Sequence, residues 1–159
     1  MLRLAAADPE QMRALGARLG SAICATAVKS ALVIGLTGEL GAGKTTLVAG
    51  LLARLGHEGP VRSPTYTLIE PYRLAGRDLY HCDLYRLQDP AELDDLGLRD
   101  LVVERNVLLV EWPERAGDRL GKPDLLLQIE YAPPGRAIAI DSSSDSGRQV
   151  LAALRLDPI

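Results

Sequence analysis

One short segment restricts the possible folds of this chain more than any other. Residues 38–45 spell GELGAGKT and match the pattern G-x-x-x-x-G-K-[ST] at every fixed position. In this P-loop pattern, glycines let backbone N–H groups approach phosphate oxygens closely, the lysine reaches the outer phosphates, and the last hydroxyl binds Mg²⁺. The segment therefore predicts a binding site for a nucleoside triphosphate.

The residues on either side of the motif agree with this prediction. Residues 31–36 (ALVIGL) form a continuous apolar run, which is typical of a strand buried on both faces of a parallel sheet. After the motif, apolar residues recur at helical spacing between Leu47 and Leu55. A helix that begins at the motif points the positive end of its dipole at bound phosphate. These flanks favour a P-loop over the alternative, a chance glycine-rich turn.

A carboxylate is also expected near the metal, at the end of a strand beside the P-loop strand. Residues 106–110 (NVLLV) are a second apolar run, and Glu111 follows them. Residues 66–72 and 78–86 alternate in polarity and predict a β-hairpin whose second strand carries Asp83. We expect Glu111 to hold the metal through a water. Asp83 either does the same or orients the attacking water as a base. The alternative for each is a surface acid or a helix-capping group.

Three further features near these acids are candidates for the site. Residues 63–67 (SPTYT) are rich in hydroxyls and predict a loop that a γ-phosphate orders, or simply a turn before a strand. His81 shares a strand face with Asp83, and we expect a hydrogen-bonded structural histidine there. Trp112, the only tryptophan, either covers the site, meets a partner or packs in the core.

Composition limits the class of protein. The length of 159 residues predicts one domain, 1–159, and 47% hydrophobic residues indicate a globular chain. Because phenylalanine is absent, we expect an aliphatic core, and the net charge of −3 implies no general affinity for nucleic acid. Residues 1–7 lack signal-peptide features and no run is long enough to span a membrane, so we expect a cytoplasmic protein. Cys24 and Cys82 are expected to be buried free thiols.

The remaining pattern predicts helices at residues 9–24, 90–96, 98–103 and 148–156 and strands at 124–131 and 137–140. Helix start signals, Asp followed by Pro, precede the first two helices. Together with the motif these elements predict a three-layer α/β P-loop NTPase with a mixed, mostly parallel sheet that carries an antiparallel hairpin. The strands at 31–36 and 106–110 should be parallel neighbours.

Four segments, in this order and spacing, resemble the TsaE (YjeE) family: GELGAGKTTLVAGLL, SPTYTLIEPY, YHCDLYRLQDPAELDDLGLRD and VLLVEWPER. The resemblance covers about residues 8–136. It implies a small bacterial P-loop protein with weak, Mg²⁺-dependent ATPase activity. Such proteins act with TsaB and TsaD in forming N6-threonylcarbamoyladenosine next to the tRNA anticodon. It further implies that tRNA is met only through that complex.

The resemblance also assigns residues. It places ATP on Gly38, Glu39, Leu40, Gly41, Ala42, Gly43, Lys44, Thr45 and Thr46. It implies Mg²⁺ at Thr45, Glu111 and Asp83, with Asp83, Glu111, Lys44 and Thr65 serving hydrolysis. It makes Arg136, in a Gly-Arg turn that by itself could face solvent or a ligand, a candidate nucleotide contact. Two departures are Cys82, where an aromatic residue is usual, and Met12, where threonine is common.

Two other functions fit the same motif. A small-molecule kinase would transfer the phosphate to an acceptor, but the arginines are scattered and form no compact lid segment. A nucleotide-dependent binding module would use ATP only to order residues 63–67 for a partner. The motif does not separate ATP from GTP, although absence of the Asn-Lys-x-Asp signature favours ATP.

Overall fold

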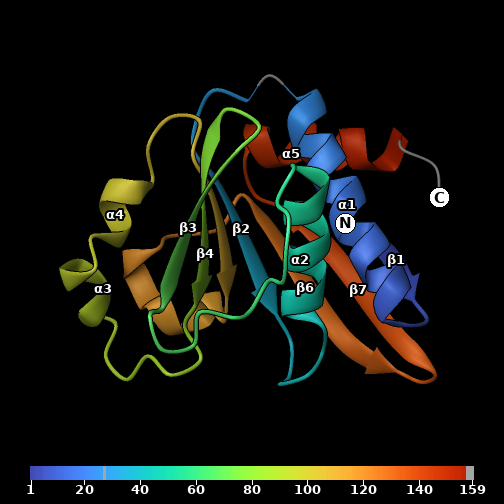
Figure 1. Ribbon diagram of the computed structural model, residues 1–159, viewed down its shortest axis with the longest axis horizontal. Coiled ribbons are helices and arrows are strands. Elements are labelled where there is room, and N and C mark those ends of the chain that lie inside the picture. Colours follow the sequence, from blue (N-terminus) through green and yellow to red (C-terminus); the bar gives the residue numbers. More distant parts are fainter. Residues whose placement is uncertain (27, 157–159) are drawn as a thin grey trace.

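Seven strands form one sheet in the computed structural model, which describes residues 1–26 and 28–156 (Figure 1). The strand order is β1-β7-β6-β2-β5-β4-β3. The strands are β1 (Leu2–Ala6), β2 (Leu32–Thr37), β3 (Ile69–Leu74), β4 (Arg77–Asp83), β5 (Val107–Glu111), β6 (Leu125–Ala132) and β7 (Gly135–Ser142). The helices are α1 (Pro9–Ala25), α2 (Lys44–Arg54), α3 (Glu92–Asp95), α4 (Leu98–Leu101), the 3₁₀ segment η1 (Pro113–Arg119) and α5 (Asp145–Leu156).

The centre of the sheet is parallel and its flanks are antiparallel. Strand β2 lies between β5 and β6 and runs parallel to both, and β4 runs parallel to β5. The hairpin β3–β4 and the pairs β6–β7 and β1–β7 are antiparallel. The predicted pairing of the strands that carry residues 31–36 and 106–110 is therefore confirmed, as is the mixed α/β fold class.

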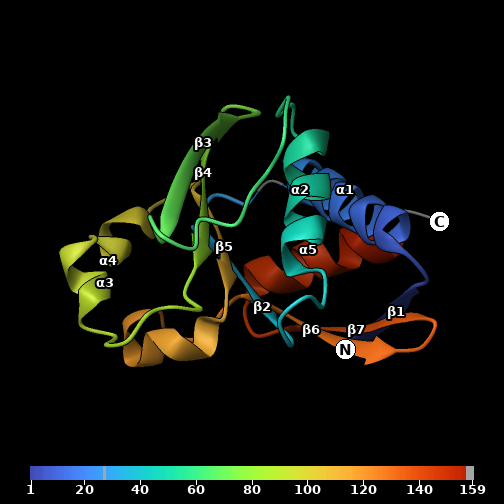
Figure 2. The same cartoon turned by 60° about the horizontal axis from the view of Figure 1, so that its bottom comes forward.

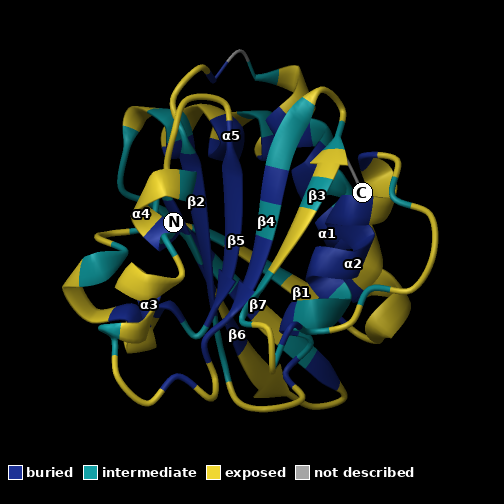
Figure 3. Cartoon of the chain, turned by 60° about the vertical axis from the view of Figure 1, so that its left-hand side comes forward, coloured by how far each residue is buried: buried dark blue, intermediate teal, exposed yellow. Residues whose placement is uncertain are grey.

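Helices cover the sheet as the three-layer prediction requires. Helices α1, α2 and α5 pack on one face, and α3, α4 and η1 lie toward the other (Figure 2). Strands β2, β4 and β5 are largely buried, whereas edge strand β3 has no buried residue (Figure 3). Among the described residues the buried hydrophobic side chains are aliphatic or sulfur-containing, which confirms the expected aliphatic core.

Helix α1 is held close to the P-loop helix α2. Asp8 caps it, since its carboxylate accepts a hydrogen bond of 2.8 Å from the backbone N–H of Gln11. Glycines allow the two helices to touch: a Cβ on Gly16 would lie 2.0 Å from a carbonyl oxygen of α2, and one on Gly50 would lie 2.0 Å from the carbonyl of Arg13. This close packing places the first turn of α1 beside the P-loop.

The hairpin is shorter than predicted at its open end, since its second strand ends at Asp83 and not at residue 86. The first strand begins at Ile69, not at residue 66, because residues 65–68 form a turn. Leu68 has a φ of +63° and donates its N–H to the carbonyl of Pro64 at 2.8 Å, so it cannot continue a strand. Pro71 lies on the edge strand, where a residue without an N–H is tolerated.

Other element bounds also needed correction. Strand β1 was not anticipated; it is short and pairs with β7 at the edge of the sheet. Helices α3 and α4 are shorter than predicted and are separated by Gly97, whose φ of +67° ends one helix before the next begins. Helix α5 starts at Asp145 rather than residue 148, and residues 113–119 form the 3₁₀ segment η1.

The cysteine prediction was half right. Cys82 is buried, but Cys24 lies on the exposed side of α1, so the expectation of two buried thiols was wrong. Burial raises the pKa of the Cys82 thiol to about 12. Within residues 1–26 and 28–156, no helix has the length and apolarity that crossing a membrane requires.

Candidate functional site

The P-loop lies between β2 and α2 and takes its shape from glycine. Gly38, Gly41 and Gly43 have φ values of +143°, +78° and +111°, in the region that side chains with a Cβ rarely adopt. A Cβ on Gly38 would lie 2.4 Å from the carbonyl oxygen of Ile129. The loop therefore needs these glycines to curl, and its curl leaves backbone N–H groups at the N-terminus of α2 available to an anion.

Lys44 begins helix α2, and its side chain is buried. Its ammonium group donates to the carbonyls of Gly38 at 2.7 Å and Glu39 at 2.9 Å. It also lies 4.2 Å from the ring centroid of Trp112, a cation–π contact. Burial lowers the pKa of Lys44 below its ordinary value, although nearby carboxylates, chiefly that of Glu111, oppose the shift. The ammonium thus bends back over its own loop.

The two predicted acids stand side by side. Asp83 ends β4 and Glu111 ends β5, and the two residues are direct partners in the parallel register. Glu111 also pairs in register with Leu36, next to the start of the P-loop. Because the carboxyl ends of parallel strands meet at one edge of the sheet, both carboxylates reach the P-loop. Both are almost fully buried, with exposed fractions of 5% and 3%.

Thr45 and His81 both bind Glu111. The Thr45 hydroxyl donates to Oε1 of Glu111 at 2.8 Å, and Nε2 of His81 lies 2.8 Å from the same oxygen. A hydroxyl that donates its proton to a carboxylate keeps its lone pairs for a cation. Oxygen atoms of Thr45, Glu111 and Asp83 are the ligand type that Mg²⁺ prefers. In the described chain no three His, Cys, Asp or Glu side chains gather as a metal cluster.

The hydroxyl-rich loop contacts Asp83 directly. The Ser63 hydroxyl donates to Oδ2 of Asp83, and the backbone N–H of Tyr85 donates to Oδ1 at 2.9 Å. Thr65 donates its N–H to the carbonyl of Ser63 at 2.8 Å. The loop therefore closes over the acid through Ser63, and both oxygens of Asp83 are engaged.

These groups surround one cavity of about 370 Å³, here called the acidic cleft. Its walls come from the P-loop, the hydroxyl-rich loop and the ends of β4 and β5, and Arg86 and Trp112 complete them. The described lining residues are Leu40, Gly41, Gly43, Lys44, Thr45, Thr46, Ser63, Thr65, Asp83, Tyr85, Arg86, Glu111 and Trp112. Three roles were predicted for Trp112, and its contact with Lys44 favours the one in which its ring covers the site.

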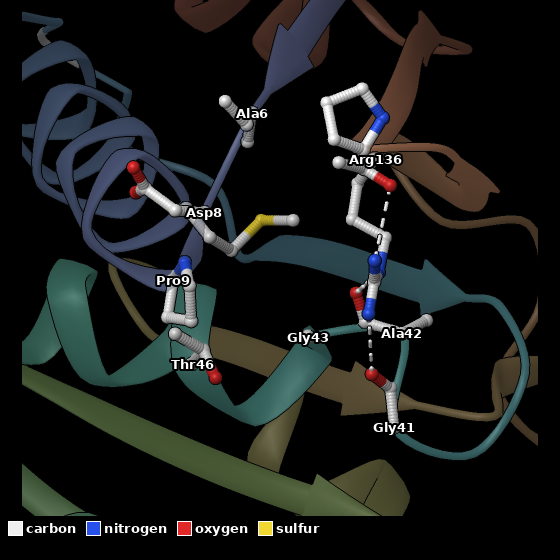
Figure 4. A pocket seen from close by; sticks show the side chains of 12 residues that line it. Ala6, Asp8, Pro9, Gly41, Ala42, Gly43, Thr46 and Arg136 are labelled. Atoms are coloured by element: carbon white, nitrogen blue, oxygen red, sulfur yellow. Dashed lines mark hydrogen bonds between the residues drawn. The ribbon is translucent and has the colours of Figure 1, made fainter.

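A second cavity, of about 230 Å³, lies on the other side of the P-loop and is here called the side cavity. Asp8 and Pro9 stand on one side of it and Arg136 and Ala42 on the other (Figure 4). Arg136 donates to the carbonyl of Ala42 at 3.1 Å and to that of Gly41 at 3.4 Å. Its guanidinium lies 3.9 Å from the ring centroid of Tyr131. Met12 also lines the side cavity and packs against Gly43, because a Cβ added to Gly43 would lie only 3.3 Å from Cε of Met12.

The family model "Threonylcarbamoyl adenosine biosynthesis protein TsaE" matches residues 6–138, a span that includes the P-loop, both acids and Arg136. The chain belongs to the TsaE family. The matched span contains all four of the segments that resemble this family.

Named relatives of this TsaE chain share most of its length. A Haemophilus influenzae protein, "tRNA threonylcarbamoyladenosine biosynthesis protein TsaE", is 39% identical over 146 residues, which are 92% of each chain. A Bacillus subtilis protein of the same name is 38% identical over 125 residues, 79% of this chain and 75% of its own. The crystal structure of Bacillus subtilis YdiB superposes with a TM-score of 0.69 at 28% identity, covering 97% of this chain and 93% of that one.

The structure brings most of the predicted site residues of this TsaE chain together. Lys44, Thr45, Thr65, Asp83 and Glu111 line the acidic cleft, and the P-loop glycines separate it from the side cavity. Thr46 borders both cavities, and Arg136 borders only the second. Glu39 contributes its carbonyl to Lys44, while the side chain of Leu40 is 69% exposed.

Several lining residues were missed by sequence reasoning. Asp8 and Pro9 were assigned only to starting a helix, yet they also form one wall of the side cavity. Arg86 lies on the acidic cleft with its guanidinium 4.7 Å from the ring centroid of Tyr66. No spacing in the chain signals these contacts, because they depend on how α1 and the hairpin pack. Arg86 does fall inside the family-like HCDLYR segment, which is the one signal that points to it.

Proposed function

We propose that this chain binds Mg²⁺–ATP at the P-loop and hydrolyses it slowly, as a component of tRNA threonylcarbamoyladenosine biosynthesis. The observation that carries the proposal is the convergence of Lys44, Thr45, Asp83 and Glu111 on one cleft beside a glycine-shaped loop. The set contains a cation for phosphate, oxygen ligands for a metal and an acid to align water, which phosphoryl transfer to water requires.

Phosphate binding would use the loop amides and Lys44. In the structure Lys44 donates to two carbonyls of its own loop, so its ammonium is already poised above the place that phosphate oxygens would take. Turning the ammonium onto the outer phosphates exchanges neutral acceptors for charged ones, which strengthens its hydrogen bonds. The charge of the phosphates would also oppose the effect of burial and keep Lys44 protonated.

The metal would be held by the oxygen atoms that Thr45 and Glu111 present. When bound, Mg²⁺ supplies positive charge that neutralises the phosphate oxygens as the terminal bond breaks. The Thr45 hydroxyl donates to Oε1 of Glu111 at 2.8 Å, which orients the lone pairs of the hydroxyl. This arrangement suits an octahedral ion that retains several waters.

Asp83 is suited to orient the attacking water. Its Oδ2 accepts from Ser63 in the structure, and the second lone pair of that oxygen can accept from a water. Ser63 and Thr65 both line the cleft, so we propose that a bound γ-phosphate orders residues 63–67 and that Thr65 contacts it. The position of Asp83, buried yet facing the cleft, supports this role.

The nucleoside would occupy the side cavity. Pro9, Met12 and Pro134 offer apolar contact, and Arg136 supplies a half-buried cation that borders the loop. The cavity adjoins the acidic cleft across Gly41, Gly43 and Thr46, the residues common to both linings. One nucleotide can thus span the two. ATP is proposed over GTP because the guanine-specific Asn-Lys-x-Asp signature is absent from the sequence.

The pathway is proposed from the relatives. Proteins in Haemophilus influenzae and Bacillus subtilis that cover most of this chain carry the name tRNA threonylcarbamoyladenosine biosynthesis protein TsaE. We propose that this chain acts there with TsaB and TsaD in the cytoplasm and meets tRNA only through them. Its net charge of −3 gives it little affinity of its own for the phosphate backbone.

One experiment tests the function and separates it from its rivals. The chain is mixed with TsaB and TsaD from the same organism, and ATP turnover without any acceptor is measured together with tRNA modification. Turnover and modification that both require the chain support the proposal. Phosphate transfer only in the presence of an acceptor would indicate a kinase. Full modification by an Asp83→Asn variant that binds ATP without turnover would indicate a nucleotide-dependent binding module.

A further inference from the structure

His81 is a buried polar residue whose position demands an explanation. It lies on β4, two residues before Asp83, and its side chain is fully buried. Its Nε2 lies 2.8 Å from Oε1 of Glu111, while Nδ1 is buried without a hydrogen-bond partner in the described chain. Leaving a polar atom unpaired in the interior is unfavourable, and a leucine at this place would avoid it. The hydrogen bond between Nε2 and Glu111 is therefore the interaction that favours a histidine at this position.

The direction of that hydrogen bond follows from chemistry. A carboxylate only accepts, so Nε2 of His81 carries the proton and donates it. Thr45 donates to the same Oε1 from helix α2. Donors from α2 and β4 thus hold one oxygen of a carboxylate on β5, and neither donor engages Oε2. The Glu111 side chain is fixed in rotation, with one oxygen free of these two donors.

His81 does not touch the place where a substrate would lie. It is absent from the described lining of the acidic cleft, whereas Glu111 and Asp83 are both part of it. Any effect of His81 on bound ligand must therefore pass through Glu111. This separates it from Lys44, which borders the cleft itself.

We propose that His81 is a positioning residue that sets the orientation of Glu111 for the metal. The inference rests on the proposed function, because it assigns Glu111 to Mg²⁺. Partners of metal-ligating side chains restrict the ligand's orientation, and their loss typically weakens metal affinity about 10- to 100-fold. The predicted hydrogen-bonded histidine is confirmed, and the proposal adds a role with a measurable consequence.

Trp112 provides a readout that does not depend on turnover. It is the only tryptophan, it follows Glu111 directly, and it lies against the Lys44 ammonium. The protein is saturated with the non-hydrolysable analogue adenosine β,γ-imidotriphosphate, and Mg²⁺ is titrated while Trp112 fluorescence is recorded. We expect His81→Leu to raise the half-saturating Mg²⁺ concentration about 10- to 100-fold. Affinity for the analogue in EDTA should stay near the wild-type value in this variant.

Two further variants make the test decisive. His81→Gln keeps an N–H donor in nearly the same place and should restore most of the Mg²⁺ response. Combining His81→Leu with Glu111→Gln should add nothing to the loss caused by Glu111→Gln alone, since the histidine acts through that carboxylate. An unchanged Mg²⁺ midpoint in His81→Leu, or equal losses in the leucine and glutamine variants, would overturn the inference. A wild-type protein with no Mg²⁺ response would instead refute the proposed function itself, and the inference with it.

Discussion

The acidic cleft and the side cavity share the P-loop but are built differently. The acidic cleft is walled by the charged side chains of Asp83 and Glu111, at the ends of parallel strands, and of Lys44, at the start of α2. The side cavity is walled by the first turn of α1 and the β6–β7 turn, and its only described lining side chains with charge are Asp8 and Arg136. Asp8 is already engaged as a helix cap.

This difference indicates that the two cavities bind different parts of the nucleotide. Charged groups fixed by the central sheet suit phosphate and metal, where position and charge must be exact to a fraction of an ångström. Apolar and backbone groups from the periphery suit a nucleoside, where contact area contributes most. Changes in the acidic cleft should therefore alter turnover and phosphate affinity, and changes in the side cavity should alter only the affinity that the nucleoside adds.

The largest expected effect comes from Asp83→Asn. The variant keeps the shape of Asp83 but loses the charge that orients water, so kcat for ATP should fall by about 10³-fold, the scale of a lost general base. ATP affinity should change little. Single-turnover hydrolysis and titration with a fluorescent ATP analogue measure the two quantities. The exposed Asp95→Asn serves as the matched control. Equal losses of turnover and binding would assign Asp83 to binding instead.

Lys44→Ala should have the next largest effect. Removing a buried cation that faces phosphate should weaken ATP binding by about 100-fold, the scale for truncating one member of a buried charged pair. Tripolyphosphate, which lacks the nucleoside, should lose the same factor. Calorimetry with both ligands measures this, with the exposed Lys122→Ala as control. Normal ATP binding and hydrolysis by Lys44→Ala would remove the acidic cleft from the proposed function.

Arg136→Ala tests the side cavity in the same way. The guanidinium is half-buried against the P-loop carbonyls and Tyr131, and its loss should weaken ATP binding by about 10-fold, as for one charge-assisted hydrogen bond. Tripolyphosphate affinity should not change. The exposed Arg73→Ala is the matched control, since Arg73 pairs with Asp78 on the β3–β4 hairpin. A parallel loss for both ligands would show that Arg136 supports the loop rather than the nucleoside.

The smallest effect should be a dependence on alkaline pH. Because burial lowers the pKa of Lys44, its ammonium loses its proton at a lower pH than an ordinary lysine, and phosphate affinity should fall as pH rises through that pKa. In Lys44→Arg the fall should disappear, since arginine stays protonated. Binding of tripolyphosphate across the alkaline range measures this. A fall of the same size in Lys44→Arg would trace the pH dependence to another group.

The lowered pKa of Lys44 has the opposite effect on the stability of the ligand-free protein, which should increase with pH. Between the lowered pKa of Lys44 and its ordinary value, the folded chain binds fewer protons than the unfolded chain. The contribution of Lys44 to the free energy of unfolding therefore rises with pH across that window. Denaturant melts of wild type and Lys44→Met over the same range should diverge in this direction.

The sequence determined the central part of the molecule. The motif at residues 38–45 and the apolar runs before and after it fixed β2, α2 and β5, because local pattern and burial agree in a parallel core. Glu111 was placed correctly from the same run. Boundaries failed where the local pattern was weak: β1 lies at an edge, and the turn at Leu68 depends on a hydrogen bond to Pro64.

Only the tertiary structure decided which side chains meet. The sequence alone does not set Asp83 opposite Glu111, since that register requires β4 to lie parallel to β5. The side cavity exists because glycines let α1 press against α2 and because the β6–β7 turn carries Arg136 back to the P-loop. The physical reason is that a motif fixes its own backbone through local sterics, whereas these contacts join segments far apart in the chain, and packing of the whole sheet and its helices sets their distances.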